Sequence, residues 1–583
     1  MAGTPYQAEQ MHRFDWTKLT EQQITSKLGA AMSGPTSASP LSDALAGSSV
    51  KIVTDEGPTL NYRFSSATQA SLTENGGAAT DIGYGALQQD HITFFSHMIP
   101  RTQKGYNVVI DEHTKLATVI EVWFSGYEDN REVQRHVWFG YVDDGGEAPS
   151  GRHVRTNRAE GKGYYWKHDT GEELLEFYPS IMYSHFVELT RSGGELGFCA
   201  PADYIQINDD FYIFTRTECE FSGAFSMYVL DANRVENVGV RLGFDRDDEL
   251  EYYVFKGQGE WLGQIAQFER FGDIAGAVVP AGPEGEPPAK GARRVYRPMD
   301  TYTILTPEET AAAAADPTVF PVRTAQGGAA GMAGNGLPPT DFLSGKEITL
   351  RWDNGEAFEY RFDSSDTLRW RRNGAGGWTE ERYQAWEPAP GVILFGHLLT
   401  GAEKGDGFSI VIDFDEALVT AFHGTLGNQW IANEAVAETW FGVVEGEGLT
   451  PPLYRRHQFI HELVGWAITW NYSTVSGLTS MHLYSTPNTI SWIIFDDAGA
   501  GGMQWSGPSE QVKIRDDLYF TYWLEEACNG TLGTILINMR TMHDTGVGYH
   551  CGRDHLSMSS VGAHGRYAGR FDVARFFEPG RKA

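Results

Sequence analysis

Two histidines lie in a phrase that the chain writes twice. Residues 93–111 read TFFSHMIPRTQKGYNVVID and residues 393–413 read ILFGHLLTGAEKGDGFSIVID, so His97 and His397 hold the same place in each copy. Successive strand residues face opposite sides, and here both sides are apolar, which predicts that each histidine is buried. A buried His can act as a general acid or base at neutral pH, or it can be a core residue hydrogen-bonded to a neighbour.

Two glutamates end a second repeated phrase, DDFYIFTRTE (209–218) and DDLYFTYWLE (516–525). At a strand period of two, Glu218 shares a face with a Tyr and an Arg, and Glu525 shares a face with a Tyr and a Trp. If that face lines a barrel, aromatic surroundings would raise the carboxyl pKa and suit it to proton transfer. If the face is outward, the same residues are merely solvated. The catalytic candidates are His97, His397, Glu218, Glu525, Tyr212 and Tyr519.

Arg216 makes the two copies unequal, because Trp523 stands in its place in the second copy. An Arg can hold a substrate carboxylate through two hydrogen bonds, whereas a Trp cannot. The second copy is richer in aromatic and His residues of the kind that line small-molecule pockets. The substrate-binding candidates are Arg216, Trp523, Trp470, Tyr472, Tyr522 and His457.

Histidine spacing does not predict a metal site. His457 and His461 are four apart, and His550, Cys551 and His555 lie close together. Residues four apart share a strand face, but neither group follows a recognised ligand pattern, and structural or surface His is the commoner role. No phosphate-binding glycine loop is present either. We therefore expect no metal and no cofactor.

The candidates sit inside a tandem duplication. NYRFSS returns as EYRFDSS, HVWFGYVDDG returns as ETWFGVVEGEG, and Arg152-His153 returns as Arg456-His457, all in the same order and at a nearly constant interval. Such ordered self-similarity is typical of duplicated domains. Two homologous copies can mimic a homodimer, so we expect them to pack together, either as a monomer with a pseudo-two-fold axis or within a homodimer.

Within each copy the apolar pattern has a period of two and is broken by Asp, Asn and Gly, which predicts short strands. Each copy splits into halves of about 100 residues, enough for one antiparallel barrel of about eight strands. We therefore predict an all-β protein of four barrels in two homologous pairs. Capping-box patterns predict short helices after Thr20 and Thr306. The expected domains are an extension (1–48), barrels at 49–150 and 151–271, a Pro/Gly/Ala-rich linker (272–342), and barrels at 343–450 and 451–583.

The composition of the chain limits the classes of partner that it is expected to bind. The net charge of −31 disfavours nucleic acid and anionic membranes, which both repel an acidic surface. No stretch approaches the length of an apolar membrane span, and the first residues lack the apolar core of a signal peptide. Four cysteines without a CxxC pair fit a reducing, cytoplasmic setting. The expected partner is a small hydrophobic or aromatic ligand.

Several motifs resemble the MoaF-like family. HELVGWAITWNYS, VKIRDDLYFTYWLEE, GTILINMRTMHDTGVGY and SSVGAHGRY are similar to its C-terminal domain, and EYRFDSS, VILFGHLL and FSIVIDFDEALVTAFHG to its N-terminal domain. The resemblance covers about 345–570 best and 50–270 more weakly. It implies tandem lipocalin-like (calycin) barrels. It also adds His185, in YSHF, as a substrate-binding candidate, with Ser480 at the matching place of the second copy.

Together these features favour a cofactor-independent enzyme that acts by acid–base chemistry on a small, largely apolar aromatic or polyketide-like molecule held in a barrel. The reaction would be of the lyase, isomerase, decarboxylase or cyclase type. The alternative is a non-catalytic binding or carrier protein with the same barrels, because fold alone does not decide function.

Overall fold

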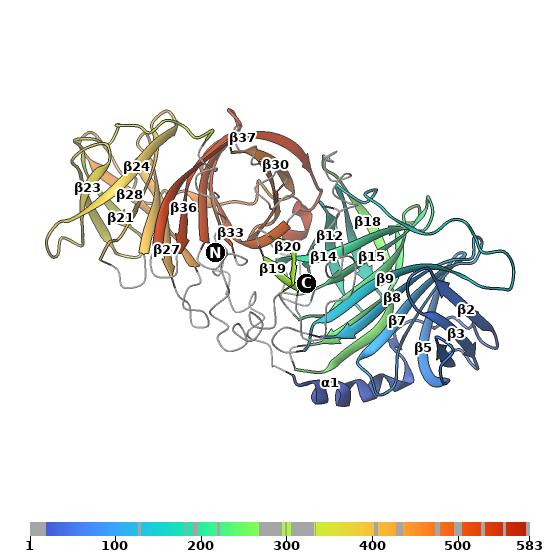
Figure 1. The fold of residues 1–583 in the computed structure, drawn as a ribbon. Helices are drawn as coiled ribbons and strands as arrows, with labels where there is room; N and C mark the ends of the chain where they lie inside the picture. The colour runs from blue at the N-terminus through green and yellow to red at the C-terminus, as the bar shows by residue number, and fades with distance from the viewer. Residues whose placement is uncertain are drawn as a thin grey trace.

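Strands make up most of the computed structural model, and they wind into four closed antiparallel barrels of eight strands each (Figure 1). The all-β, four-barrel prediction is confirmed. The structure describes residues 19–125, 130–180, 183–190, 196–218, 222–245, 247–266, 294–297, 300–304, 332, 334–401, 406–426, 435–472, 479–494, 504–525, 531–551 and 556–578.

Barrels 1 and 3 are the equivalent barrels that begin each copy, and each closes by pairing its first strand with its last. Barrel 1 contains β2 (Ser49–Thr54), β3 (Thr59–Phe64), β4 (Gln69–Glu74), β5 (Thr80–Gln89), β6 (Ile92–Met98), β7 (Lys104–Asp111), β8 (Leu116–Phe124) and β9 (Val133–Val142). Barrel 3 contains β21 (Glu347–Trp352), β22 (Ala357–Phe362), β23 (Thr367–Arg372), β24 (Thr379–Ala389), β25 (Val392–Leu398), β26 (Asp406–Asp413), β27 (Leu418–Leu426) and β28 (Ala435–Gly446).

Barrels 2 and 4 end each copy and close in the same way, β11 on β18 and β30 on β37. Barrel 2 contains β11 (Lys162–His168), β12 (Glu173–Tyr178), β13 (Tyr183–Glu188), β14 (Leu196–Gln206), β15 (Phe211–Thr217), β16 (Phe225–Asp231), β17 (Glu236–Phe244) and β18 (Leu250–Gln264), with β1 (Thr36–Ser37) and β10 (Val154–Arg155) paired to its outside. Barrel 4 contains β30 (Trp466–Asn471), β31 (Thr479–Thr486), β32 (Thr489–Ile494), β33 (Gln504–Arg515), β34 (Leu518–Glu525), β35 (Thr531–Asn538), β36 (His543–Cys551) and β37 (Leu556–Arg570), with β29 (Gln458–Phe459) paired to β33.

The predicted N-terminal helix is present as α1 (Glu21–Lys27), and Thr20 with Gln23 forms the predicted capping box. The 3-10 turns η3 (Leu28–Ser33) and η6 (Ala574–Phe577) and a hairpin of β19 (Arg294–Arg297) and β20 (Asp300–Ile304) complete the elements. The helix predicted after Thr306 lies outside the described residues. Within the described part of the chain, no helix is long and apolar enough to cross a membrane.

The barrels follow one another in space in the order 3, 4, 2, 1, so that the two copies meet through barrels 2 and 4 (Figure 1). Barrel 1 packs on barrel 2 through an apolar layer that includes Phe94 and Val240. Barrel 3 packs on barrel 4, where Phe422 stacks on Phe520 with ring centroids 4.1 Å apart. Each strand of barrels 1 and 3 that carries the repeated His is therefore covered on both faces.

The contact between barrels 2 and 4 uses equivalent strands of both copies. β14 lies against β33 and β32, and β13 lies against β33; β13 and β14 have β32 and β33 as their equivalents in barrel 4. At this contact the backbone N–H of Gly197 donates to Oγ1 of Thr489 at 3.3 Å, and Phe177 packs against Phe571. The same patch thus faces itself across a pseudo-two-fold axis, as in an isologous interface.

Candidate functional site

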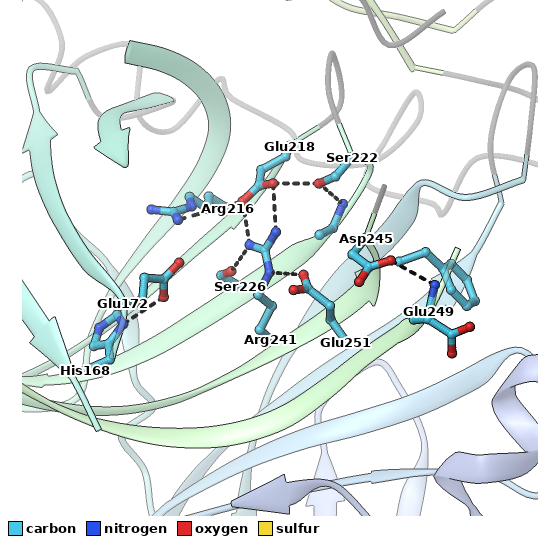
Figure 2. A network of polar contacts seen from close by, with 12 residues as sticks. His168, Glu172, Arg216, Glu218, Ser222, Ser226, Arg241, Asp245, Glu249 and Glu251 are labelled. Atoms are coloured by element: carbon cyan, nitrogen blue, oxygen red, sulfur yellow. Dashed lines mark hydrogen bonds and ion pairs between the residues drawn. The ribbon is translucent and has the colours of Figure 1, made fainter. Parts of the chain in front are cut away.

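The interior of barrel 2 holds a network of buried charges (Figure 2). Glu218 accepts hydrogen bonds from Nη1 and Nη2 of Arg241 at 2.7 and 3.1 Å, and from Ser222 at 2.6 Å. Nε of Arg241 donates to Glu251 at 2.7 Å. The network joins the end of β15 to β17 and β18, so three strands hold Glu218 in one position.

Arg216 lies two residues before Glu218 on the same face of β15. It donates to a second buried carboxylate, Glu176 of β12, and its guanidinium lies 3.8 Å from the ring centroid of Phe186. Arg216 is fully buried. Its Nε has no hydrogen-bond partner among the described residues. Of the two directions that the sequence leaves open for this face, the structure has the inward one, and Nη2 of Arg216 is also without a hydrogen-bond partner there.

Glu176 and Glu218 differ in their proton affinity. Burial raises the pKa of Glu176 to about 7, because the loss of hydration outweighs the attraction of Arg216. Burial also acts to raise the pKa of Glu218, but Arg241 outweighs it and the pKa is lowered. The raised pKa expected for Glu218 is therefore wrong: the carboxyl poised near neutral pH is Glu176.

Other polar groups surround this pair. His168 and Glu172 are 2.9 Å apart on the side of the barrel formed by β11 and β12 (Figure 2). Burial raises the pKa of Tyr178, Tyr204 and Tyr228 well above the usual range, so these phenols are neutral hydrogen-bond donors. The inner face of barrel 2 therefore carries an ionisable carboxyl, a guanidinium and neutral hydroxyls.

Tyr212 and Tyr519 lie at barrel ends, away from the glutamates. The Tyr212 hydroxyl donates to the carbonyl of Asp209 at 3.0 Å, and the Tyr519 hydroxyl donates to Glu462 at 2.7 Å. Each tyrosine lies six positions before the glutamate of its strand, which corresponds to a distance of about 20 Å along the strand. The structure therefore does not bring the Tyr and Glu candidates together.

Barrel 4 is filled by aromatic rings. Trp470, Trp492, Trp505 and Trp523 belong to its inner cluster. A side chain on Gly533 would meet the Trp523 ring at 2.2 Å, so the glycine makes room for the indole. Glu525 lies on the same strand as Trp523, and its backbone pairs with Thr531 of the next strand. The side chain of Glu525 lies outside the described residues.

The polar groups inside barrel 4 are poorly paired. The Asp544 carboxylate interacts with the backbone N–H of Ala563 but forms no hydrogen bond of ordinary geometry among the described residues, and Nδ1 of His482 and Oγ of Ser480 have no partner there. Burial raises the pKa of Asp544 to about 8 and lowers that of His482 to about 3. The Tyr472 hydroxyl lies 3.3 Å from Nε2 of His482. Trp470, Tyr472 and Trp523 therefore share an interior with buried polar groups that a ligand could satisfy.

Three predicted binding residues lie outside the barrel interiors. Tyr522 points toward barrel 3 and packs on Phe422 with ring centroids 4.9 Å apart. His457 lies in the connection between barrels 3 and 4, where Nδ1 is 2.8 Å from Thr420. The prediction that these residues join a pocket inside the second copy does not match their positions.

His185 is the third. It stacks on Phe177 at the contact between the two copies, and its Nδ1 lies 3.0 Å from the carbonyl of Phe198. Strand pairing gives its counterpart as Ser491 rather than Ser480, because His185 pairs with Cys199 as Ser491 pairs with Ser506.

His97 and His397 lie inside barrels 1 and 3, fully buried as predicted. Nε2 of His97 is 2.9 Å from the Tyr62 hydroxyl, and Nε2 of His397 is 3.0 Å from the Tyr360 hydroxyl. Burial lowers the pKa of His97 to about 3 and that of His397 to about 4. Rings surround both pairs. This geometry is that of a neutral core histidine bonded to a neighbour.

The structure describes only the first of the two histidine groups. His457 is bonded to Thr420 and His461 is exposed. The side chains of His550, Cys551 and His555 lie outside the described residues.

The sequence interpretation missed Glu176, Arg241 and Asp544, because each is one charged residue in a strand of ordinary pattern and its partner comes from a distant strand. Tyr62 and Tyr360 could have been found, since both stand in the repeated phrase YRF.

Comparison with known proteins identifies the second copy. Residues 323–428 match the MoaF N-terminal domain, and residues 457–570 match the MoaF C-terminal domain. A search of curated proteins finds no match. Among solved structures, the LG1–3 region of the laminin α2 chain is 9% identical over 72% of this chain and 88% of that chain, with a TM-score of 0.11. A prolyl endopeptidase is 8% identical over 82% and 57%, with a TM-score of 0.09.

Such low TM-scores carry no argument about fold or function, and the likeness to calycin barrels stays a prediction. The family matches fall on the two barrels that the second copy forms. Within the second copy, residues 323–428 and 457–570 are thus similar to a MoaF N-terminal domain followed by a MoaF C-terminal domain.

Proposed function

We propose that the chain is a cofactor-independent enzyme that performs acid–base chemistry inside barrel 2 on a small, largely apolar aromatic or polyketide-like molecule. The observation that carries this proposal is the buried Glu176–Arg216 pair, in which the pKa of Glu176 is about 7. A carboxyl with such a pKa can both give and take a proton at neutral pH. The reaction class is that of a lyase, isomerase, decarboxylase or cyclase.

The roles follow from position. Glu176 transfers the proton, and the free Nε of Arg216 binds the negative charge of a carboxylate or enolate. Glu218 stays ionised through Arg241 and keeps Arg216 oriented, since its Oε1 lies 3.8 Å from Nη2 of Arg216. Phe186 offers an aromatic face beside the guanidinium.

A second candidate function is ligand binding without turnover, in barrel 4. The weakly paired carboxylate of Asp544 favours it, because a buried polar group without full hydrogen bonding costs free energy that a ligand donor would recover. The surrounding tryptophans supply the apolar wall expected of a carrier. The carboxylate–arginine pairs of barrel 4 in the described part of the chain, Arg540–Asp517 and Arg515–Asp413, lie at strand ends and not in its interior, so catalysis is not assigned to it.

The test uses the full chain and a panel of hydroxycinnamic acids, whose decarboxylation replaces the carboxylate by a proton and releases carbon dioxide. We expect carbon dioxide release by the wild type and a fall in kcat of about 10²- to 10⁴-fold in Glu176→Gln. The control is Thr420→Val, which removes one hydroxyl on the outer face of barrel 3, far along the chain from barrel 2.

Loss of rate in Glu176→Gln with unchanged binding supports the assignment. Release of carbon dioxide at the same rate in both proteins would remove Glu176 from the mechanism. Quenching of tryptophan fluorescence without carbon dioxide release from any acid removes the decarboxylase version and favours the carrier.

A further inference from the structure

Three potential metal ligands meet on the outside of barrel 1, far from the residues considered above. His91 precedes β6, Asp111 ends β7, and His113 lies in the turn after β7; one ligand atom from each lies within 4.8 Å of the others. Asp111 is 1% exposed, whereas His113 is exposed. The rings of His91 and His113 stack with centroids 4.1 Å apart.

The second copy has a cation at the same place. Arg515, at the end of β33, donates from Nε and Nη2 to the two oxygens of Asp413 at 2.6 Å each, and from Nη2 to Asp415 at 2.9 Å. Asp413 is completely buried. The guanidinium therefore balances a buried carboxylate and ties barrel 4 to barrel 3.

The two places are equivalent by backbone hydrogen bonding as well as by sequence. Glu112 N–H donates to the His91 carbonyl as Phe414 N–H donates to the Gly391 carbonyl. Both Asp111 and Asp413 accept a backbone N–H from the residue two positions later. The matching residues are His91 and Gly391, Asp111 and Asp413, His113 and Asp415, and, from INDDFY and IRDDLY, Asn208 and Arg515.

The first copy has lost the guanidinium but kept the buried carboxylate. Asn208 stands in place of Arg515, and no Lys or Arg forms an ion pair with Asp111 in the described ranges. Two imidazoles have appeared instead. A Cβ on Gly391 would lie 3.1 Å from Asp415, so His91 and His113 occupy positions that touch in both copies.

We propose that His91, Asp111 and His113 bind a divalent transition metal, Zn²⁺ in the first instance, which takes the place of the guanidinium. Two imidazoles and a carboxylate are a common ligand set for Zn²⁺. Parallel rings cannot both aim their in-plane lone pairs at one ion, so His113, the exposed member, turns on binding. His91 packs edge-on against Phe211 of barrel 2 with ring centroids 5.3 Å apart, so the metal would lie beside the contact between barrels 1 and 2. This site is independent of the reaction proposed for barrel 2.

The test titrates the chelator-treated full chain with Zn²⁺ by calorimetry and uses Co²⁺ absorption to report the ligands. The main variant is His91→Gly/His113→Asp/Asn208→Arg, which installs the ion pair of the second copy. We expect it to bind one Zn²⁺ fewer than the wild type, or to bind at that site at least about tenfold more weakly. The control, His461→Ala, removes an exposed histidine elsewhere and should leave the titration unchanged.

Thermal unfolding gives a second measurement. Zn²⁺ should raise the melting temperature of the wild type and not that of the triple variant, since only a ligand of the folded state stabilises it. Equal Zn²⁺ binding by the wild type and the folded triple variant would overturn the proposal. If the triple variant does not fold, His113→Ala alone decides: unchanged affinity and an unchanged Co²⁺ spectrum contradict the site.

Discussion

Barrels 2 and 4 have equivalent strands in the same order and differ in what fills them. Barrel 2 encloses ion pairs, and barrel 4 encloses tryptophans. Strand pairing matches Arg216 with Trp523, Glu176 with His482, Arg241 with Gly548, Ser226 with Gly533 and Asn237 with Asp544.

Residues that contact one another inside barrel 2 are replaced together at the equivalent positions of barrel 4. Where Arg216 becomes Trp523, its acidic partner Glu176 becomes the neutral His482, and Ser226 becomes Gly533, which admits the indole. A buried ion that loses its partner is strongly destabilising, whereas replacing a whole pair can be neutral. The comparison teaches that a barrel interior changes as a unit, so one copy can keep a charged site while the other becomes apolar.

The largest expected effect breaks one charge pair in barrel 2. Arg216→Met leaves Glu176 buried without its cation and should lower the free energy of unfolding by about 3–5 kcal/mol. Urea unfolding of the full chain, with hydrogen exchange on β12 to assign the loss to barrel 2, measures it. Arg216→Met/Glu176→Leu should recover most of the loss. A double variant as unstable as the single one would contradict the idea that the pair is exchanged as a unit.

A smaller effect concerns the position where only barrel 4 is acidic. The pKa of Asp544 is raised by burial to about 8 from its ordinary 3.8, so folding favours the protonated form. Stability is then greatest below about pH 4 and falls as the pH rises toward about 8. Asp544→Asn cannot ionise and should be more stable than the wild type by on the order of 5 kcal/mol at pH 8, with little difference at pH 4.

Melting curves across this pH range test the effect. The reciprocal change Asn237→Asp, in barrel 2, should introduce a loss of stability at high pH. A wild type whose difference from Asp544→Asn does not vary with pH would show that Asp544 is not protonated in the fold.

The smallest effect should be equal in the two copies. Thr118 lies 2.8 Å from Nδ1 of His153, and Thr420 lies 2.8 Å from Nδ1 of His457, so the same hydrogen bond holds the connection between barrels in each copy. Thr118→Val and Thr420→Val should each cost about 1 kcal/mol in urea unfolding. Clearly unequal losses would mean that the copies differ outside their interiors too.

The sequence predicts the strand faces well. Two apolar faces on one strand predicted that His97 and His397 are buried, and the period of two placed Arg216 and Glu218 on one face without deciding whether that face points inward. Tyr522 and Trp523 are neighbours on one strand, so their side chains must face opposite sides. With Trp523 inside the barrel, Tyr522 must point outward, as it does.

Partners across a barrel could not be predicted. Glu176 meets Arg216 because β12 and β15 face each other after closure, which depends on every strand between them. The pKa of each glutamate depends on those partners, and for this reason the sequence favoured Glu218 over Glu176. The spacing of His91 from Asp111 and His113 likewise became informative only when a hairpin brought them together.

The position of β1 has a consequence for the order of events during synthesis. Thr36 and Ser37 pair with Tyr253 and Val254 of β18, and Ile24 of α1 packs in the layer between barrels 1 and 2. These residues leave the ribosome before barrel 1, and the strand that pairs with β1 is the last strand of barrel 2 to be made, whereas α1 and Gly34 also contact Gln103 and Tyr84 of barrel 1. The segment can therefore dock in two steps, first on barrel 1 and then, through β1, on barrel 2 once β18 has been made, and it links the two barrels from outside.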